Sequence, residues 1–240
     1  SFLYGFRDRE MITDIFEETC GARLTMNYNI PGGLMFDIPS NFQTKVKEFI
    51  IHFRKKLPEY DQLMTNNIIF RNRTEGIGIL TKEDAISYGV TGPSGRASGW
   101  NNDIRKIKPY SAYDRVDFKE ITYTEGDSFA RYKVRIDEMW ESMNIIEQLI
   151  DNIPEGNYKE KTRVVIKLPK TEIYQSVETA RGELGVYINS DGKKSPYRVK
   201  FRSPGLSNLN ALNSMAKGGK IADLVTIMST IDLVIPDIDR

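Results

Sequence analysis

The chain has 240 residues, of which 40% are hydrophobic and 28% are charged, an ordinary composition for a globular protein. This length allows one large core, or a helical body with a smaller β region. Lys and Arg number 34 and Asp and Glu number 33, so no overall charge favours nucleic acid or an anionic membrane. No run reaches the ~18–20 apolar residues of a membrane-spanning helix, and the nearest one, 221–235, contains two aspartates. The composition therefore predicts a soluble protein.

The N-terminal residues and the single cysteine bear on where the protein is found. Cys20 excludes an internal disulfide and suits a reducing cytoplasm. Residues 1–10 include charges and have no signal-peptide core. They start with apolar residues and without a methionine, so we expect residue 1 to be a cut within a longer protein.

The first part of the chain predicts two helices. Residues 7–18 have apolar positions at helical spacing and lead to Cys20–Gly21, a typical helix end. Pro31–Gly33 indicates a turn, and Ser40 is expected to cap an amphipathic helix that Pro58 interrupts. The apolar face of this second helix contains Phe42, Val46, Phe49, Ile50, Phe53 and Leu57.

The middle of the chain predicts one short and one long helix. Thr81 begins a capping-box-like sequence, and the short helix that follows should stop at Gly89. Residues 89–99 are rich in Gly and Ser and predict an irregular loop, while 110–125 alternate loosely and suggest extended structure. The strongest helical pattern covers residues 128–151.

The last third mixes strands and helices. Segments 163–166 and 183–189 are β-like, and the second is joined to 197–201 by Ser-Asp-Gly-Lys-Lys, which indicates a hairpin. Residues 206–234 predict two helices separated by a Gly-Gly pair. The pattern is α+β with helices dominant and without internal repeats.

Several common active-site chemistries are excluded. One Cys and one His cannot supply paired CxxC motifs, an HExxH motif or the ligands of an iron–sulfur cluster. His52 lies beside the apolar face of the second helix, where a histidine is more often packed against its neighbours than catalytic. Gly76-Ile-Gly78 lacks the third glycine of a dinucleotide-binding loop, and the loop at 89–99 lacks the Lys of a P-loop. The residues alone predict no autonomous active site.

A series of short motifs nevertheless runs through the whole chain in a fixed order. They are Gly21-Ala-Arg23, Pro31-Gly-Gly33, Leu63-Met-Thr-Asn-Asn67, Phe70-Arg-Asn-Arg-Thr74, Gly76-Ile-Gly78, Arg96-Ala-Ser-Gly99, Asp103-Ile-Arg105-Lys106, Pro109-Tyr110, Arg181-Gly-Glu183, Ser190-Asp-Gly192, Pro196-Tyr197-Arg198, Pro204, Asn208-Leu209, Ile221-Ala-Asp223 and Asp239-Arg240. Together they resemble the C-terminal part of the D-type subunit, the large subunit of the quinone module, of bacterial NADH:quinone oxidoreductase, respiratory complex I. This family is related to the large subunits of nickel–iron hydrogenases.

The resemblance implies an α+β, mainly helical fold like that of a hydrogenase large subunit. It places a helical body at residues 1–160, a small β region with a hairpin at 161–203, and C-terminal helices that return to the body at 204–240. Alone, such a fragment is expected to be inactive.

The C-terminus bears on the metal site that the hydrogenases have. They end in a pattern like Asp-Pro-Cys-x-x-Cys, whose thiolates hold the metal, whereas here Val234 and Asp237 stand at the two cysteine positions. Valine has no ligand atom, so we expect no metal. The resemblance implies a quinone site instead, with Asp232 and Val234 as first candidates. The alternative is that Val234 is core packing and Asp232 a satisfied buried acid.

Arg96 is a weaker candidate, and two other arginines are expected to be structural. Arg96, in the Arg-Ala-Ser-Gly loop, could belong to a polar network that leads to the quinone cavity, but a surface or ion-paired structural arginine is the more frequent alternative. Arg71 and Arg73 are expected to brace the fold or the contacts between subunits through carboxylates.

The resemblance also implies the partners. The B-type iron–sulfur subunit, with the terminal 4Fe–4S cluster, would enclose the quinone together with this chain, and subunits of types C, H and I would complete the assembly. NAD(H) would bind on distant subunits and no cofactor on this chain. The protein would lie peripherally on the cytoplasmic side of the membrane, held there by its partners. The alternative is a noncatalytic, hydrogenase-derived subunit of a ferredoxin-dependent ion-translocating complex.

The chain departs from the family pattern at several places. The resemblance places the His and Tyr that flank the quinone headgroup in an N-terminal portion, so we do not expect to find them in these 240 residues. Thr25 replaces a His near the cluster of the B-type partner, so proton-coupled tuning through this position is not expected. Ile30 replaces an Arg, and a helical segment usual between 156 and 178 is missing.

Overall fold

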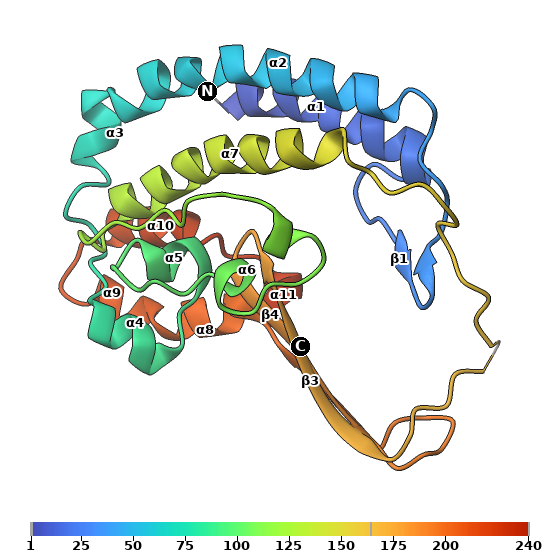
Figure 1. Cartoon of the computed structure of the whole chain (residues 1–240). Coiled ribbons are helices and arrows are strands. Elements are labelled where there is room, and N and C mark those ends of the chain that lie inside the picture. Colours follow the sequence, from blue (N-terminus) through green and yellow to red (C-terminus); the bar gives the residue numbers. More distant parts are fainter. Residues whose placement is uncertain (1, 164, 240) are drawn as a thin grey trace. The chain divides into compact units, whose positions relative to one another are not determined.

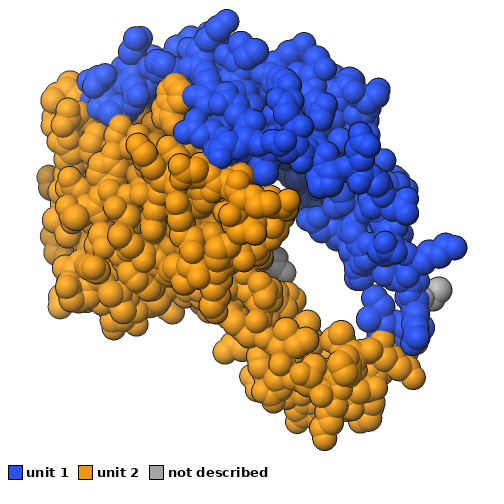
Figure 2. Space-filling model, viewed as in Figure 1, with its two compact units in different colours: residues 1–67, 142–166 blue, residues 68–141, 167–240 orange. Residues whose placement is uncertain are grey.

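The computed structural model describes residues 2–163 and 165–239 of the protein. The chain divides into two compact units, which have different colours in Figure 2. Unit 1 contains Ser1–Asn67 and Ser142–Ile166, and unit 2 contains Ile68–Glu141 and Lys167–Arg240. The long helix α7 contributes residues to both units.

Unit 1 is built on helices α1 (Phe2–Cys20) and α2 (Phe42–Tyr60), which lie side by side in Figure 1. The predicted end of the first helix is confirmed, because Gly21 follows it with a left-handed φ of 72°. A small hairpin of β1 (Asn29–Ile30) and β2 (Gly33–Leu34) separates the two helices.

Two details of α2 correct the sequence-based prediction. Asn41, not Ser40, is the N-cap residue, because the amide of Phe42 bonds to the carbonyl of Pro39 and shifts the helix start. Pro58 does not break the helix, which continues to Tyr60 and then widens into the π-helical segment η1 (Asp61–Thr65). The irregularity expected at the proline occurs three residues later.

The apolar face predicted for α2 forms much of the core of unit 1, and Val46, Phe49, Ile50 and Leu57 are buried. The C-terminal part of α7 (Ser128–Ile150) packs here as well. Gln43 donates to the carbonyl of Ile150 over 3.1 Å, and Arg54 pairs with Glu147 at 2.7 Å. The long helix predicted at 128–151 is confirmed as α7, and these contacts hold its C-terminal part against α2.

Unit 2 contains short helices and a small antiparallel sheet. The helices are α3 (Ile68–Asn72), α4 (Lys82–Tyr88), α5 (Gly92–Arg96), α6 (Ile104–Ile107), α8 (Pro204–Asn210), α9 (Leu212–Ala216), α10 (Ile221–Thr230), α11 (Ile235–Ile238) and the 3-10 turn η2 (Tyr113–Arg115). The predicted cap of α4 is confirmed, because Thr81 Oγ1 accepts from the amide of Asp84 at 3.1 Å. Gly89 ends this helix in a left-handed conformation.

The structure differs from three local predictions. The segment 89–99 is not wholly irregular, because it contains α5, whose residues are all buried. Residues 110–125 form no strand; the rings of Tyr110, Tyr113 and Phe118 pack on one another instead of facing a partner strand. Residues 163, 165 and 166 are not in a strand, and Val164 lies outside the described residues.

The sheet of unit 2 is antiparallel, with strands in the order β3 (Thr171–Thr179), β4 (Gly182–Ser190) and β5 (Arg198–Arg202). The predicted hairpin between β4 and β5 is confirmed, whereas the sequence did not indicate β3. In Figure 1 the β3–β4 turn lies among the helices of unit 2, and the opposite end of the sheet extends away from them. Contacts of α5, α6 and α8 with the sheet hold the turn end.

The main apolar core of unit 2 gathers residues from distant parts of the chain. It consists of Leu80, Ala85, Val90, Ala211, Met215, Ile227 and Ile231. This core joins α4 to the C-terminal helices, so Ile227 and Ile231 pack on a segment about 140 to 150 positions earlier. The predicted α+β, mainly helical fold class is confirmed. None of the helices described here combines the length and the apolar character that a bilayer crossing requires.

Candidate functional site

The segment after α10 places the two leading candidates, Asp232 and Val234. Asp232 has a left-handed φ of 55°, a conformation that Asp tolerates and that is typical just beyond a helix. The amides of Asp232 and Leu233 bond back to the carbonyls of Ser229 and Met228, both at 3.4 Å. The end of α10 therefore fixes the backbone from which both candidate side chains project.

Helix α11, which begins after Val234, is anchored by Asp237. Its Oδ2 accepts from the amide of Gly205 at 2.9 Å, and a Cβ on Gly205 would lie 2.3 Å from the same oxygen. A side chain at position 205 would therefore displace the Asp237 carboxylate from this contact. Asp237, which the resemblance places at the second thiolate position of the hydrogenase pattern, thus has a structural partner here.

Arg181 holds Asp232 from the turn between β3 and β4. Its Nε lies 3.2 Å from the carbonyl oxygen of Asp232 and 3.3 Å from the carboxylate Oδ2. The Asp232 side chain is 42% exposed, so a ligand can reach it. Val234 is half-buried. An accessible carboxylate and an apolar side chain therefore lie two residues apart on a fixed backbone.

Arg96, the third candidate, lies deeper. Its side chain is 2% exposed and pairs with Glu138 at 2.7 Å and with Glu178 at 2.8 Å. Burial alone would lower the pKa of Arg96, but the negative charges of Glu138 and Glu178 have the larger effect and raise it. Burial raises the pKa of Glu178 even though the charge of Arg96 acts against it. Arg96 cannot touch a ligand from this position, and its link to a quinone site stays a prediction.

Arg135 on α7, which the sequence did not single out, connects these two groups. Burial lowers the pKa of Arg135, and the negative charges of Asp232 and Glu138 act against this shift. One terminal nitrogen donates to the carbonyl of Arg131 at 2.8 Å, whereas its buried Nη2 finds no hydrogen-bond partner in the described part of the chain. In the sequence, Arg135 could have been noticed as a second arginine four residues after Arg131 in an otherwise amphipathic helix.

The two remaining arginines pair with carboxylates, as predicted. Arg71 pairs with Glu75 at 2.6 Å and lies over the ring of Phe129. Arg73 pairs with the buried Asp223 of α10 at 3.1 Å. Both contacts brace unit 2.

His52, the single histidine, borders the apolar face of α2. Its Nε2 lies 3.2 Å from Oδ1 of Asp8, which also accepts from Arg7 and Tyr60. Burial alone would raise the pKa of Asp8, but these hydrogen bonds lower it. Across residues 2–163 and 165–239, no three His, Cys, Asp or Glu side chains converge as metal ligands.

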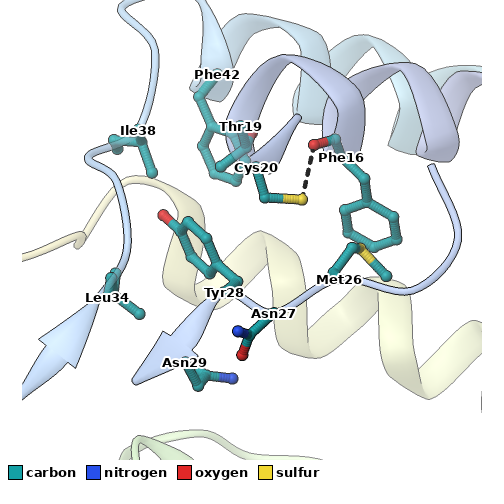
Figure 3. Close-up of a pocket in the computed structure, with 10 residues that line it drawn as sticks. All are labelled: Phe16, Thr19, Cys20, Met26, Asn27, Tyr28, Asn29, Leu34, Ile38 and Phe42. Atoms are coloured by element: carbon teal, nitrogen blue, oxygen red, sulfur yellow. Dashed lines mark hydrogen bonds between the residues drawn. The ribbon is translucent and has the colours of Figure 1, made fainter. Parts of the chain in front are cut away.

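Unit 1 has a cavity of about 500 Å³ at the C-terminal end of α1, shown in Figure 3. It is lined by Phe16, Thr19, Cys20, Met26, Asn27, Tyr28, Asn29, Leu34, Ile38 and Phe42. The hydroxyl of Tyr28 is buried without a hydrogen-bond partner among the described residues, and burial raises the pKa of this phenol. Thr25, which the resemblance places at a His position of the family, is exposed just before this cavity in the sequence. Ile30, placed by the resemblance at an Arg position, is half-buried in β1.

The sequence matches one protein family and is similar to several named enzyme subunits. It matches the family described as the respiratory-chain NADH dehydrogenase 49 Kd subunit over residues 1–167 and 162–240. It is 57% identical over 240 residues to the C/D-type subunit of NADH-quinone oxidoreductase of Bacteroides fragilis, covering 100% of this chain and 45% of that protein. It is 46% identical over 239 residues to the D-type subunit of the same kind of enzyme from Bacillus cereus, covering 99% of this chain and 65% of that protein. The chain spans less than half the length of its C/D-type relatives, and the family inferred from the ordered motifs is confirmed.

Proposed function

Because the chain belongs to the family of the 49-kDa subunit of respiratory-chain NADH dehydrogenase, we propose that it forms one wall of a quinone-reduction site in an NADH:quinone oxidoreductase. The proposal depends most on the segment from Asp232 to Val234. There, an accessible carboxylate held by Arg181 lies two residues before a half-buried apolar side chain. A quinone headgroup needs both, since it is a flat apolar ring with carbonyl oxygens at its ends.

Each candidate residue has a different task in this proposal. Val234 contacts the ring or its substituents. Asp232 influences the hydrogen bonding and protonation of the nearby quinone oxygen. Arg96 is too deeply buried to touch the ring, so it acts indirectly, by fixing Glu138 near Arg135.

The rest of the chemistry belongs to partners in this proposal. Reduction of a quinone to a quinol takes up two electrons and two protons. The electrons would come from the 4Fe–4S cluster of the B-type iron–sulfur subunit, and NAD(H) would be oxidised on distant subunits. Subunits of types C, H and I would surround the chain and hold it peripherally on the cytoplasmic side of the membrane. Finding no stoichiometric nickel or iron on this chain would fit this division.

The alternative, a noncatalytic subunit of a ferredoxin-dependent complex, is less well supported. The relatives of this chain are named as subunits of NADH-quinone oxidoreductases. Their names give NADH as the donor and quinone as the acceptor, which favours the catalytic assembly.

The test uses the complete complex with Asp232→Asn or Val234→Met. Each variant should change the KM or kcat for a short-chain quinone by about tenfold or more, because each alters a direct contact. Electron transfer from NADH to an artificial acceptor that bypasses the quinone should be unchanged. Matched controls are Asp239→Asn and Val225→Met, both at exposed positions of unit 2. Wild-type quinone kinetics in both site variants would refute the proposal.

A further inference from the structure

The backbone of Arg181 is fixed tightly within unit 2. The residue belongs to the two-residue turn between the paired residues Thr179 and Gly182. A Cβ on Gly182 would lie 2.5 Å from the hydroxyl of Thr91, so the turn is in direct contact with the loop before α5. Asn208 of α8 donates to the carbonyl of Arg181 at 3.4 Å. The turn therefore presents the Arg181 side chain from a rigid base.

The guanidinium group of Arg181 uses only part of its donor set. Its Nε engages the carbonyl and the carboxylate of Asp232. Within the residues that the structure describes, neither terminal nitrogen has a hydrogen-bond partner. The side chain is 30% exposed, so these nitrogens can be reached from outside unit 2.

Two other arginines of unit 2 have no such free donors. Arg131 is fully buried, and its three side-chain nitrogens donate to the carbonyls of Gly126 and Gly78 and to the hydroxyls of Ser128 and Thr230. Arg96 is enclosed by its two carboxylates. Arg181 alone among these three offers unused donors beside the accessible Asp232.

We propose that the terminal nitrogens of Arg181 donate hydrogen bonds to a carbonyl oxygen of a quinone headgroup while Nε holds Asp232 in place. This inference rests on the proposed quinone site. The planar fork of arginine suits an oxygen with two lone pairs. As electrons reach the ring, the oxygen gains negative charge and its hydrogen bonds to the guanidinium strengthen. Arg181 thus binds the reduced ring more strongly than the oxidised ring and favours its formation.

The test compares Arg181→Lys and Arg181→Gln in the complete complex. Gln removes the charge and the fork, so kcat/KM for a short-chain quinone should fall about 10- to 100-fold. Lys keeps the charge and should recover part of this loss. NADH oxidation with an artificial acceptor that bypasses the quinone should remain at the wild-type rate. The control is Arg198→Gln, an exposed arginine of β5 in the same sheet, which should behave as wild type.

The results separate this inference from the proposed function. If both Arg181 variants assemble and reduce quinone normally while Asp232→Asn does not, the inference fails and the quinone site stands. If all these variants reduce quinone normally, the proposed function fails and the inference fails with it. Loss of assembly in both Arg181 variants would make the residue structural and would also overturn the inference.

Discussion

Arg96 on α5 and Glu178 on β3 form an ion pair of 2.8 Å in which the side chains are only 2% and 3% exposed. The other carboxylate of Arg96, Glu138, comes from α7. A single guanidinium therefore joins two helices to the strand that leads into the turn of Arg181. Removing a charge from such a buried pair leaves its partner without compensation in a poorly solvated place.

We expect Arg96→Met to lower the free energy of unfolding by about 3–5 kcal/mol, because Glu178 loses its countercharge. The double variant Arg96→Met with Glu178→Leu should be more stable than the single one, since no fully buried carboxylate is left unpaired. Urea denaturation of the purified protein measures both effects. Arg115→Met is the control, because Arg115 is 68% exposed and should change stability by less than about 0.5 kcal/mol. Equal losses at positions 96 and 115 would contradict this account.

The parts of the fold that the sequence predicted are those that local chemistry determines. The helix at 128–150 follows from apolar residues at helical spacing, and α4 from its Thr81 cap and Gly89 stop. Strand β3 was missed because its residues, Thr-Glu-Ile-Tyr-Gln-Ser-Val-Glu-Thr, are largely polar and gain their structure by pairing with β4. Likewise α5 forms in a Gly-rich sequence because tertiary contacts bury it.

The candidate site was predicted only in part, for a related reason. Asp232 and Val234 could be named because they match positions of a family template. Their environment depends on residues far along the chain: Arg181 is 51 positions from Asp232, and Arg135 comes from another helix. Neither pattern nor propensity connects such residues.

The pH dependence of stability should report on Asp103. This carboxylate is fully buried and accepts from Arg105 at 2.6 Å. Burial acts to raise its pKa, but the hydrogen bonds and charge of Arg105 outweigh it and hold the pKa below the ordinary 3.8. A lowered pKa stabilises the folded protein fully above about pH 4, and this stabilisation is lost as the pH falls further.

We therefore expect the difference in unfolding free energy between wild type and Asp103→Asn to be constant from about pH 7 to 5 and to shrink below about pH 4. Urea denaturation across this range measures it. Asp114→Asn is the control, because Asp114 is 63% exposed and should alter stability little at any pH. A difference that persists unchanged to about pH 2 would rule out this role of Asp103.

The replacement of a thiolate position by Val234 predicts that no nickel binds at this end of the chain, since a valine has no ligand atom. Elemental analysis of the purified protein should find less than stoichiometric nickel and iron. Either metal at one equivalent per chain would show that other residues have taken over as ligands.

Two glycines with nearly the same left-handed φ test how the turn of Arg181 is held. Gly92 has a φ of 69° and Gly76 a φ of 67°. A Cβ on Gly92 would lie 2.5 Å from the carbonyl oxygen of Arg181, whereas one on Gly76 would have nothing within 4 Å. Alanine at either position is strained by the left-handed φ, at about 1–2 kcal/mol, but only at Gly92 does its Cβ also collide with the turn.

Gly92→Ala should therefore destabilise the protein by about 1–3 kcal/mol more than Gly76→Ala, in denaturation of the two purified variants. Displacement of the turn should also weaken the contact of Arg181 with Asp232, so in the complete complex only Gly92→Ala should raise the KM for a short-chain quinone. An equal free energy of unfolding for the two variants would mean that the turn moves away from the added Cβ without loss of stability. A normal quinone KM in an otherwise destabilised Gly92→Ala would mean that the position of Arg181 does not depend on this contact.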